Sequence, residues 1–297
     1  MLRGRLRTKR LETTYSPYAL RAHAVREQIV ARGQGGIRAN VGQRDLKTVR
    51  VVLPPCDEQR ALARALTDVA DLVAALHRLA AKKAAIKQGL MEHLLTGYAR
   101  LPGFDGRWAE RALGDIARVT MGQSPPSASY NADHRGLPLV QGNADIRDRR
   151  TIGSFWTTAP AKKCAAGNVL LTVRAPVGFT AVATSASCLG RGVCSIASAS
   201  GSNRYLYHAL VRAEPQWAAL EQGSTFTAAN SDQVRAFALL VPDDPDEQTA
   251  IGEALDAADS EIRALRDQAV KAQAIKHGMM QQLLTGRVRL PRAKVIA

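Results

Sequence analysis

The side chains of this sequence that could carry out specific chemistry are amides and guanidinium groups in loop-like segments. Such groups form paired hydrogen bonds with the edges of nucleic-acid bases, so they are suited to reading the sequence of duplex DNA. For any one of them, an ordinary solvated loop residue is the competing interpretation. The base-reading candidates are Gln123, Gln141, Asn143, Arg174, Arg191 and Asn230.

Two tight clusters of basic residues in the same region could bind phosphate groups and so position a duplex. The chain carries a formal net charge of +15, and a polyanion is its natural partner because each cation that meets a phosphate releases counterions. Charge alone would also suit a basic protein without such a partner. Aromatic residues make up only 5% of the chain, which favours duplex DNA over single-strand base stacking. The phosphate-binding candidates are Arg147, Arg149, Arg150, Lys162 and Lys163.

The sequence shows no motif for catalysis or for binding a cofactor or metal. An adenine methyltransferase would carry Asn/Asp-Pro-Pro-Tyr/Phe, whereas the nearest string here, Ser124–Ser127, lacks both the amide or acid and the aromatic ring. The phosphate-loop pattern is absent, and the scattered histidines and four cysteines have no zinc-type or Cys-x-x-Cys spacing. We therefore predict a chain that is not an enzyme, with no cofactor and no metal.

An internal repeat organises the elements that must position these side chains. The run Ile86–Gly97 recurs without a gap as Ile275–Gly286, an offset of 189 residues (275 − 86). It continues through Arg100-Leu101-Pro102 and Arg289-Leu290-Pro291. This period is too long for a solenoid and indicates a duplicated module.

Each copy of the repeat predicts one long helix. Apolar residues alternate steps of four and three, as in a coiled-coil seam, and acidic residues and Thr-Gly mark the starts and ends. Two similar seams in one chain are most simply buried by packing on each other, which predicts an antiparallel pair. The seam positions are Leu62, Leu66, Val69, Val73, Leu76 and Ala80, then Ile251, Leu255, Ala258, Ile262, Leu265 and Ala269.

The segment between the helices has a mixed α/β pattern with many loops. A weaker repeat precedes each helix, because residues 11–53 resemble residues 200–241, the end of this segment. One copy of the segment is therefore complete, and only the tail of another precedes the first helix. The predicted strands are Leu137–Gln141, Val169–Val173, Thr180–Thr184, Val193–Ala197 and Phe237–Val241, with a helix around Tyr205–Glu221.

The order of these motifs resembles the specificity subunits of type I restriction–modification systems. A Pro-x-x-x-(Asp)-Glu-Gln entry to a long helix, ending in Leu-Leu-Thr-Gly, is similar to the conserved regions of that family. The similarity covers nearly the whole chain, and the order of motifs is more specific than any one of them. The stretches similar to a target recognition domain are Leu113–Asp115, Gly122–Pro126, Leu139–Gly142, Val169–Gly178 and Gly223–Thr225.

This resemblance implies a non-catalytic subunit that recognises a DNA sequence and directs DNA methylation and restriction. The implied fold class is α+β: a mixed α/β target recognition domain with two long conserved helices packed as an antiparallel coiled coil. The expected domains are the tail of a first target recognition domain (1–53), the first conserved helix as a coiled-coil spacer (54–102), the complete target recognition domain (103–241), the second conserved helix (242–291) and a C-terminal tail (292–297).

The partners that the resemblance implies are double-stranded DNA, methyltransferase (modification) subunits and a restriction subunit, with no membrane. The opening of the first recognition domain is missing, which leaves an alternative open. The chain would then be a truncated or silent copy, or a half-subunit that acts only as a homodimer or as a coiled-coil scaffold. Its longest apolar runs are strand-sized and its start lacks the apolar run of a secretory signal, so we expect a soluble cytoplasmic protein.

Overall fold

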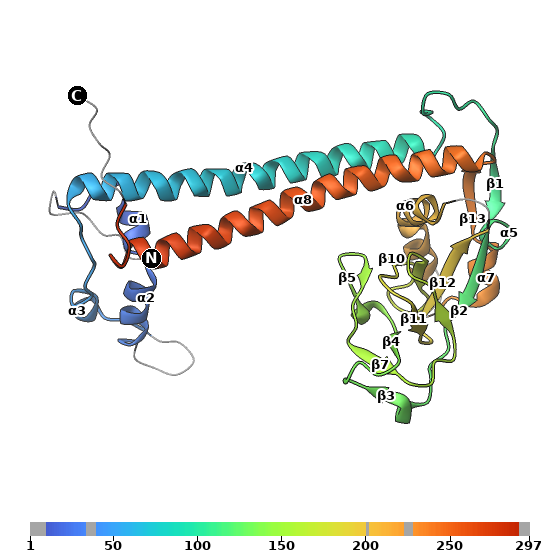
Figure 1. Cartoon of the computed structure of the whole chain (residues 1–297), viewed down its shortest axis with the longest axis horizontal. Coiled ribbons are helices and arrows are strands. Elements are labelled where there is room, and N and C mark those ends of the chain that lie inside the picture. The colour runs from blue at the N-terminus through green and yellow to red at the C-terminus, as the bar shows by residue number, and fades with distance from the viewer. Residues whose placement is uncertain (1–9, 34–39, 200–201, 223–227, 291–297) are drawn as a thin grey trace. The chain divides into compact units, whose positions relative to one another are not determined.

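A computed structural model describes residues 10–33, 40–199, 202–222 and 228–290 of the chain (Figure 1). The chain divides into two compact units, one made of residues 1–82 with 261–297 and the other of residues 83–260. The Gly223–Thr225 motif and the expected C-terminal tail, 292–297, lie outside the described residues.

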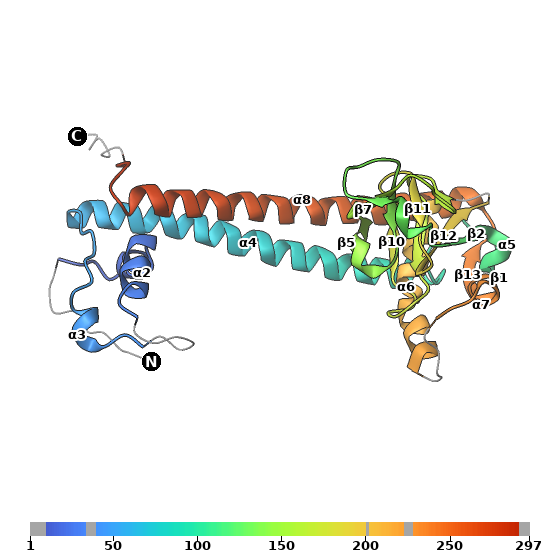
Figure 2. The same cartoon turned by 90° about the horizontal axis from the view of Figure 1, so that it is seen from below.

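The two predicted long helices are α4 (Cys56–Leu94) and α8 (Pro245–Leu283), and each has 39 residues. Pro55 precedes α4 and Pro245 opens α8, positions where proline's missing N–H costs no helical hydrogen bond. Acidic residues occupy the first turn of both helices, at the positive end of the helix dipole. The two helices lie side by side in both views (Figures 1 and 2).

The predicted seam is the face that these helices bury, because every seam position is buried or half-buried. In the first unit, Leu62 near the start of α4 shares a core cluster with Leu283 at the end of α8. In the second unit, Leu94 at the end of α4 shares a cluster with Ile251 near the start of α8. The start of each helix therefore meets the end of the other, and the predicted antiparallel pairing is confirmed.

The sequence repeat produces matching ion pairs in the two units. Arg100, just beyond α4, donates from Nε and Nη2 to the carboxylate of Glu247 at 2.5 and 2.6 Å. Its repeat counterpart Arg289, just beyond α8, lies 3.4 Å from Glu58, the counterpart of Glu247. Glu247 is fully buried, so its pair with Arg100 is the one that satisfies a buried charge.

The repeated Thr-Gly motif ends both helices in the same way. Gly97 and its counterpart Gly286 have φ of 70° and 74°, the left-handed conformation that glycine adopts at little cost. The backbone N–H two residues later turns back to the last helical turn. The Ala99 N–H donates a hydrogen bond to the His93 carbonyl (3.1 Å), and in the second copy the Val288 N–H donates to the Gln282 carbonyl (3.3 Å).

The first unit places short helices beside the start of α4. Tyr15 and Ala19 pack with Leu62 in its core cluster, and the fully buried Gln59 amide donates to the Pro54 carbonyl at 2.7 Å. These short helices are α1 (Ser16–Ala19), α2 (His23–Val30) and α3 (Gln43–Leu46).

The weaker sequence repeat between residues 11–53 and 200–241 is only partly reflected in secondary structure. In the second unit the repeated segment ends in strand β13 (Ala238–Pro242), which pairs with β1 (Trp108–Ala112). The corresponding residues 49–53 have no assigned secondary structure. A strand needs a partner for its backbone groups, and among the described residues of the first unit no strand pairs with this segment.

The second unit contains a two-stranded, a six-stranded and a five-stranded sheet among its described residues. The first is the β1–β13 pair, the second has the order β2-β12-β9-β10-β6-β5 and the third β3-β7-β4-β11-β8. The strands are β2 (Ala117–Met121), β3 (Tyr130–Asn131), β4 (Leu137–Val140), β5 (Ile146–Arg147), β6 (Arg150–Thr151), β7 (Phe155–Thr157), β8 (Lys163–Cys164), β9 (Val169–Thr172), β10 (Thr180–Val182), β11 (Ser187–Leu189) and β12 (Val193–Ser198). The helices are α5 (Leu113–Ile116), α6 (Asn203–Gln222) and α7 (Ser231–Ala236), with 3-10 turns η1 (Ser127–Ser129) and η2 (Asn143–Asp145).

Strand β9 lies at the centre of this unit and is buried on both faces. Val169 and Leu171 point into the larger core, which also contains Trp217 of α6. Leu170 points the other way, into a smaller cluster with Leu189 of β11. Alternate side chains of one strand thus pack against both neighbouring layers.

The predicted strands and helix of this unit all form within two residues of the expected bounds, and the α+β fold class is confirmed. Strands β1, β2, β7, β11 and the two-residue strands were not predicted. No helix in the described part of the chain is long and apolar enough to cross a bilayer.

Candidate nucleic-acid interface

Strands of both larger sheets of the second unit end at one place. In the five-stranded sheet, β4 and β11 run parallel, and their last residues, Val140 and Leu189, pair with each other. In the six-stranded sheet, β2 ends where the antiparallel β12 starts, because Met121 pairs with Cys194. Strand β9 is also antiparallel to β12 and ends beside the start of β12. Loops that leave these strands must therefore meet.

Gln141 and Arg191 are brought together by the loops that follow β4 and β11. The N–H of Gly190 donates to the Val140 carbonyl at 2.7 Å, so the residues after both strands are neighbours. Gly192 lies so close to Gln141 that an added Cβ would stand 2.2 Å from the Gln141 carbonyl oxygen. Only glycine fits this approach, which explains why the loop reads Gly190-Arg191-Gly192.

Gln123, after β2, and Arg174, after β9, lie beside the same two loops. The N–H of Gln123 donates to the Leu189 carbonyl at 2.9 Å. The N–H of Val173 donates to the Gly192 carbonyl, also at 2.9 Å, which places Arg174 next to the 190–192 loop.

The two asparagines complete the group. Asn143 stands two residues after Gln141 and opens η2. The N–H of Ala229 donates to the Val173 carbonyl at 2.8 Å and brings Asn230 to the same edge. All six base-reading candidates therefore lie at one edge of the second unit. We call this group the strand-end cluster: Gln123, Gln141, Asn143, Arg174, Arg191 and Asn230.

Five of the six side chains in the strand-end cluster are free for a ligand. They are exposed, and their side chains form no hydrogen bond or ion pair with other described residues. Asn230 differs, because its Oδ1 accepts the Gln233 N–H at 2.9 Å and the Gln233 side chain accepts the Asn230 N–H. This capping box begins α7. The structure therefore gives Asn230 a local role that the sequence interpretation missed, and the five free side chains are Gln123, Gln141, Asn143, Arg174 and Arg191.

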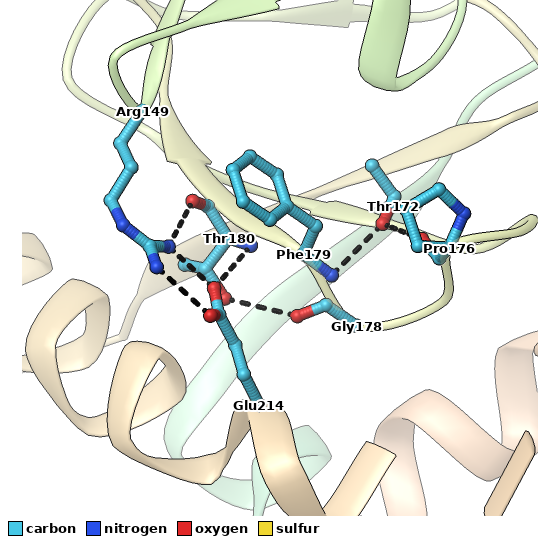
Figure 3. Close-up of polar contacts among 7 residues, drawn as sticks. All are labelled: Arg149, Thr172, Pro176, Gly178, Phe179, Thr180 and Glu214. Atoms are coloured by element: carbon cyan, nitrogen blue, oxygen red, sulfur yellow. Dashed lines mark hydrogen bonds and ion pairs between the residues drawn. The ribbon is translucent and has the colours of Figure 1, made fainter. Parts of the chain in front are cut away.

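Three of the phosphate-binding candidates lie on one hairpin, made of β5 and β6. Arg147 and Arg150 pair directly across it, and both are exposed. The turn residues Asp148 and Arg149 both have positive φ, 49° and 59°, the pattern of a type I′ turn. The turn directs Arg149 elsewhere: its guanidinium forms an ion pair with Glu214 of α6 and lies over the Phe179 ring (Figure 3). Arg149 is therefore not grouped with the other two.

The two candidate lysines flank the strand-end cluster on the side of β11. The Lys162 carbonyl accepts the Leu189 N–H at 2.8 Å, and Lys163 pairs with Cys188 in the β8–β11 ladder. Both side chains are exposed. The Arg147–Arg150 hairpin follows directly in the chain from η2, which Asn143 opens.

Two acidic residues position this basic region, and both were missed from the sequence. The buried carboxylate of Asp145 accepts the Gln141 N–H at 2.7 Å and so shapes the turn that presents Gln141 and Asn143. Glu214 holds Arg149, and this hydrogen bond is the main cause that raises the pKa of the Arg149 guanidinium above its usual value. No local sequence pattern indicates that Asp145 or Glu214 positions these residues.

One group of the described residues could offer ligands to a metal ion: His208, Asp256 and Asp259, whose ligand atoms lie within 4.8 Å of one another. Cationic side chains already neutralise both carboxylates. Lys87 Nζ lies 2.6 Å from Asp259, and Arg204 Nε lies 3.4 Å from Asp256. A metal ion would have to displace these partners, so the group is better described as an ionic contact between α4, α6 and α8.

The unit's stability should fall in alkaline solution. Burial raises the pKa of Cys194 from 9.0 to about 12 and that of Tyr207 from 10.0 to about 12. In the unfolded chain Cys194 ionises around pH 9 and Tyr207 around pH 10, while in the folded chain both stay neutral to well above those values. The free energy of unfolding, measured by urea titration, should fall by about 3 kcal/mol between pH 9 and 11. A Cys194→Ala variant should lose less over the same range, and equal slopes would contradict this assignment.

Residues 106–272 match the family described as the type I restriction modification DNA specificity domain. A Methanocaldococcus jannaschii protein described as the specificity subunit of type I restriction enzyme MjaX is 29% identical over 266 residues. That match covers 85% of this chain, and the chain spans 62% of the length of that relative.

Solved structures give the same result. The HsdS subunit from Thermoanaerobacter tengcongensis matches with a TM-score of 0.55 and 27% identity, over 94% of this chain and 71% of its own. A chain from a study of the assembly and conformational transition of the type I R-M system matches with a TM-score of 0.62 and 28% identity, over 92% of this chain and 71% of its own. The S subunit from M. genitalium, at 14% identity and a TM-score of 0.68 over 93% of this chain and 73% of its own, shows likeness of fold alone.

Proposed function

The chain belongs to the type I restriction modification DNA specificity family, and we propose that it is a DNA sequence-recognition subunit with no catalytic site of its own. The observation that carries this proposal is the strand-end cluster. All six of its residues fall inside the family match, 106–272, and five present free amide or guanidinium groups at one edge. These are the groups that read base edges in a duplex.

In this proposal the residues divide by type of contact. Gln123, Gln141, Asn143, Arg174 and Arg191 contact base edges, while Asn230 holds α7 in place beside them. Arg147, Arg150, Lys162 and Lys163 contact phosphates and fix the register of the duplex. The target recognition domain corresponds to residues 103–241, and residues 54–102 and 242–291 carry the two conserved helices.

The partners we propose are methyltransferase subunits and, for cleavage, a restriction subunit, all of which would carry the chemistry that this chain lacks. Support for a docked partner comes from α4. Leu72 and Leu79 stand seven residues apart on the part of this helix that belongs to the first unit and are 51% and 43% exposed, although large apolar side chains normally avoid water. A partner helix packed on this face would bury them.

We also propose that residues 1–53 hold the tail of a first recognition domain. If this part reads no DNA, the chain would read half a site as a monomer and a two-part site as a homodimer. Light scattering of the purified chain at several concentrations separates these states, and the mapped DNA site should be bipartite only for the dimer.

The test of the function is to express the chain with a type I modification subunit, purify the complex and map the sites that it methylates. The expected result is a defined methylated motif that disappears when this chain is omitted. Methyl transfer by this chain alone, with S-adenosylmethionine added, would contradict the proposal. Random methylation by the complex would contradict it equally.

Gln141→Ala with Asn143→Ala should relax the methylated motif at one or two positions. Each bidentate amide contact discriminates against a wrong base by about 1–3 kcal/mol, so a wrong base should be accepted about 10- to 100-fold more often. Sequencing of methylated sites measures this directly. The variant Asn131→Ala, whose amide bonds only with backbone groups of Arg135 and Trp156, should leave the motif intact. An unchanged motif in the double variant would show that these amides do not read bases.

A further inference from the structure

The β5–β6 hairpin holds two like charges against each other. Arg147 and Arg150 are directly paired across the hairpin, and among the described residues neither side chain has an acidic or hydrogen-bonding partner. Like charges directly opposite in a ladder repel each other. An anion such as a DNA phosphate between the two guanidinium groups would remove this repulsion, so the hairpin needs a firm anchor to present them together before DNA arrives.

The anchor is Arg149, whose guanidinium points toward the carboxylate of Glu214 (Figure 3). Its Nη1 and Nη2 donate to the two carboxylate oxygens of Glu214 at 2.5 and 2.9 Å, and Nη1 also donates to the Thr180 carbonyl at 3.1 Å. The Arg149 guanidinium carbon lies 4.9 Å from the centre of the Phe179 ring. Since Arg149 sits at a left-handed φ of 59°, unusual for a residue with a long side chain, these contacts must hold the turn in that conformation.

Glu214 joins the hairpin to the strand beside it. Its carboxylate also accepts the Thr180 N–H at 2.9 Å, at the start of β10. The Arg149 carbonyl in turn accepts the Val182 N–H at 2.9 Å. One carboxylate on α6 thus fixes both the hairpin and the first residue of β10.

The same contacts reach the loop that carries Arg174. Phe179, under the Arg149 guanidinium, donates its N–H to Thr172 Oγ1 at 2.9 Å, and that hydroxyl donates to the Pro176 carbonyl at 2.5 Å (Figure 3). The N–H of Gly178 closes the loop onto the Thr172 carbonyl at 2.8 Å. The loop 173–178 therefore rests on the residues that Arg149 and Glu214 hold.

We propose that Arg149 and Glu214 are positioning residues for DNA binding: Arg149 anchors the hairpin to α6 and does not contact phosphate, and Glu214 is required for DNA affinity although it is acidic. This rests on the proposed DNA-reading function. It makes a prediction opposite in sign to simple electrostatics, by which removing a negative charge beside a basic surface strengthens DNA binding.

The test measures binding of the full chain to a duplex of about 30 base pairs with arbitrary mixed sequence, at several salt concentrations. Glu214→Gln keeps the shape of the side chain but removes its charge, and we expect binding to weaken about 10-fold. Arg149→Lys keeps the charge but loses the two-pronged contact, and should weaken binding similarly. The matched control Glu110→Gln removes one exposed acid from β1 and should change affinity less than 2-fold. Tighter binding by Glu214→Gln would overturn the proposal.

Two further measurements separate positioning from a general loss of fold. In an Arg147→Ala, Arg150→Ala background, Glu214→Gln should lower affinity less than it does in the native chain. The reason is that Glu214 acts in part by holding those two arginines in position for DNA. Amide hydrogen exchange without DNA should become faster at Val182 in Glu214→Gln and stay slow at Leu171 in the central strand. Unchanged exchange at Val182 would overturn the anchor even if DNA binding changed. Failure of the native chain to bind any duplex would contradict the proposed function instead, while the exchange experiment still decides the anchor.

Discussion

Replacing Arg174 and Arg191 together with alanine should lower the affinity for the recognised DNA site by about 30- to 25,000-fold. Both guanidinium groups are exposed and have no partner among the described residues, and the Val173–Gly192 hydrogen bond holds their loops side by side. A paired arginine contact to guanine contributes about 1–3 kcal/mol to discrimination between bases. Loss of two such contacts should therefore cost about 2–6 kcal/mol of binding free energy at the recognised site. The measurement is a competition binding assay with the mapped site and a scrambled duplex of equal length.

A matched control separates base reading from loss of charge. Arg107 and Arg118 are also exposed arginines of the second unit, but they lie before β1 and at the opposite end of β2 from the strand-end cluster. Their double alanine variant removes the same two charges and should bind the recognised site within about 5-fold of the native chain, with a similar salt slope. If the two double variants lose equal affinity, the arginines of the cluster act only through charge.

The long helices and their pairing could be predicted because their signal is local and repeated. A seam residue every three or four positions defines the buried face, and the duplicated Thr-Gly predicts where both helices end. The helix α6 was similarly predicted as Tyr205–Glu221 and observed as Asn203–Gln222. In each case the residues that determine the element lie within it.

The gathering of the strand-end cluster could not be predicted, because it depends on pairing between distant segments. No local pattern reveals that β4 runs parallel to β11, or that β2 and β9 both lie against β12. The residue types at loop tips were sufficient to select the candidates. The structure supplied the edge at which they meet.

Arg149 and Asn230 show two different reasons for a missed role. Arg149 stands between Arg147 and Arg150 in the sequence, so all three were predicted to bind phosphate together. A turn with two non-glycine residues at positive φ instead directs Arg149 to Glu214. Such a turn has no clear sequence signal. For Asn230 a signal existed, because Asn230-x-x-Gln233 before a short helix has the spacing of a capping box.

Gly192→Ala should damage both folding and recognition, because the strand-end cluster depends on a close approach of two backbones. The added methyl carbon would lie 2.2 Å from the Gln141 carbonyl oxygen, far inside van der Waals contact. Neither partner is a flexible side chain, so the 190–192 loop must move away. That movement would break the hydrogen bond from the Val173 N–H to the Gly192 carbonyl, which holds Arg174 beside Arg191.

We expect Gly192→Ala to lower the free energy of unfolding by about 2–4 kcal/mol and to abolish sequence preference in DNA binding, even at temperatures where the variant stays folded. Gly142→Ala is the matched control, since its φ of 176° is ordinary extended backbone and an added Cβ there meets no other atom within 4 Å. It should change the free energy of unfolding by less than about 0.5 kcal/mol. Urea denaturation and competition binding measure both quantities. A Gly192→Ala variant with native stability and native sequence preference would show that the two loops do not approach each other as closely as the structure places them, and the strand-end cluster would lose its geometric basis.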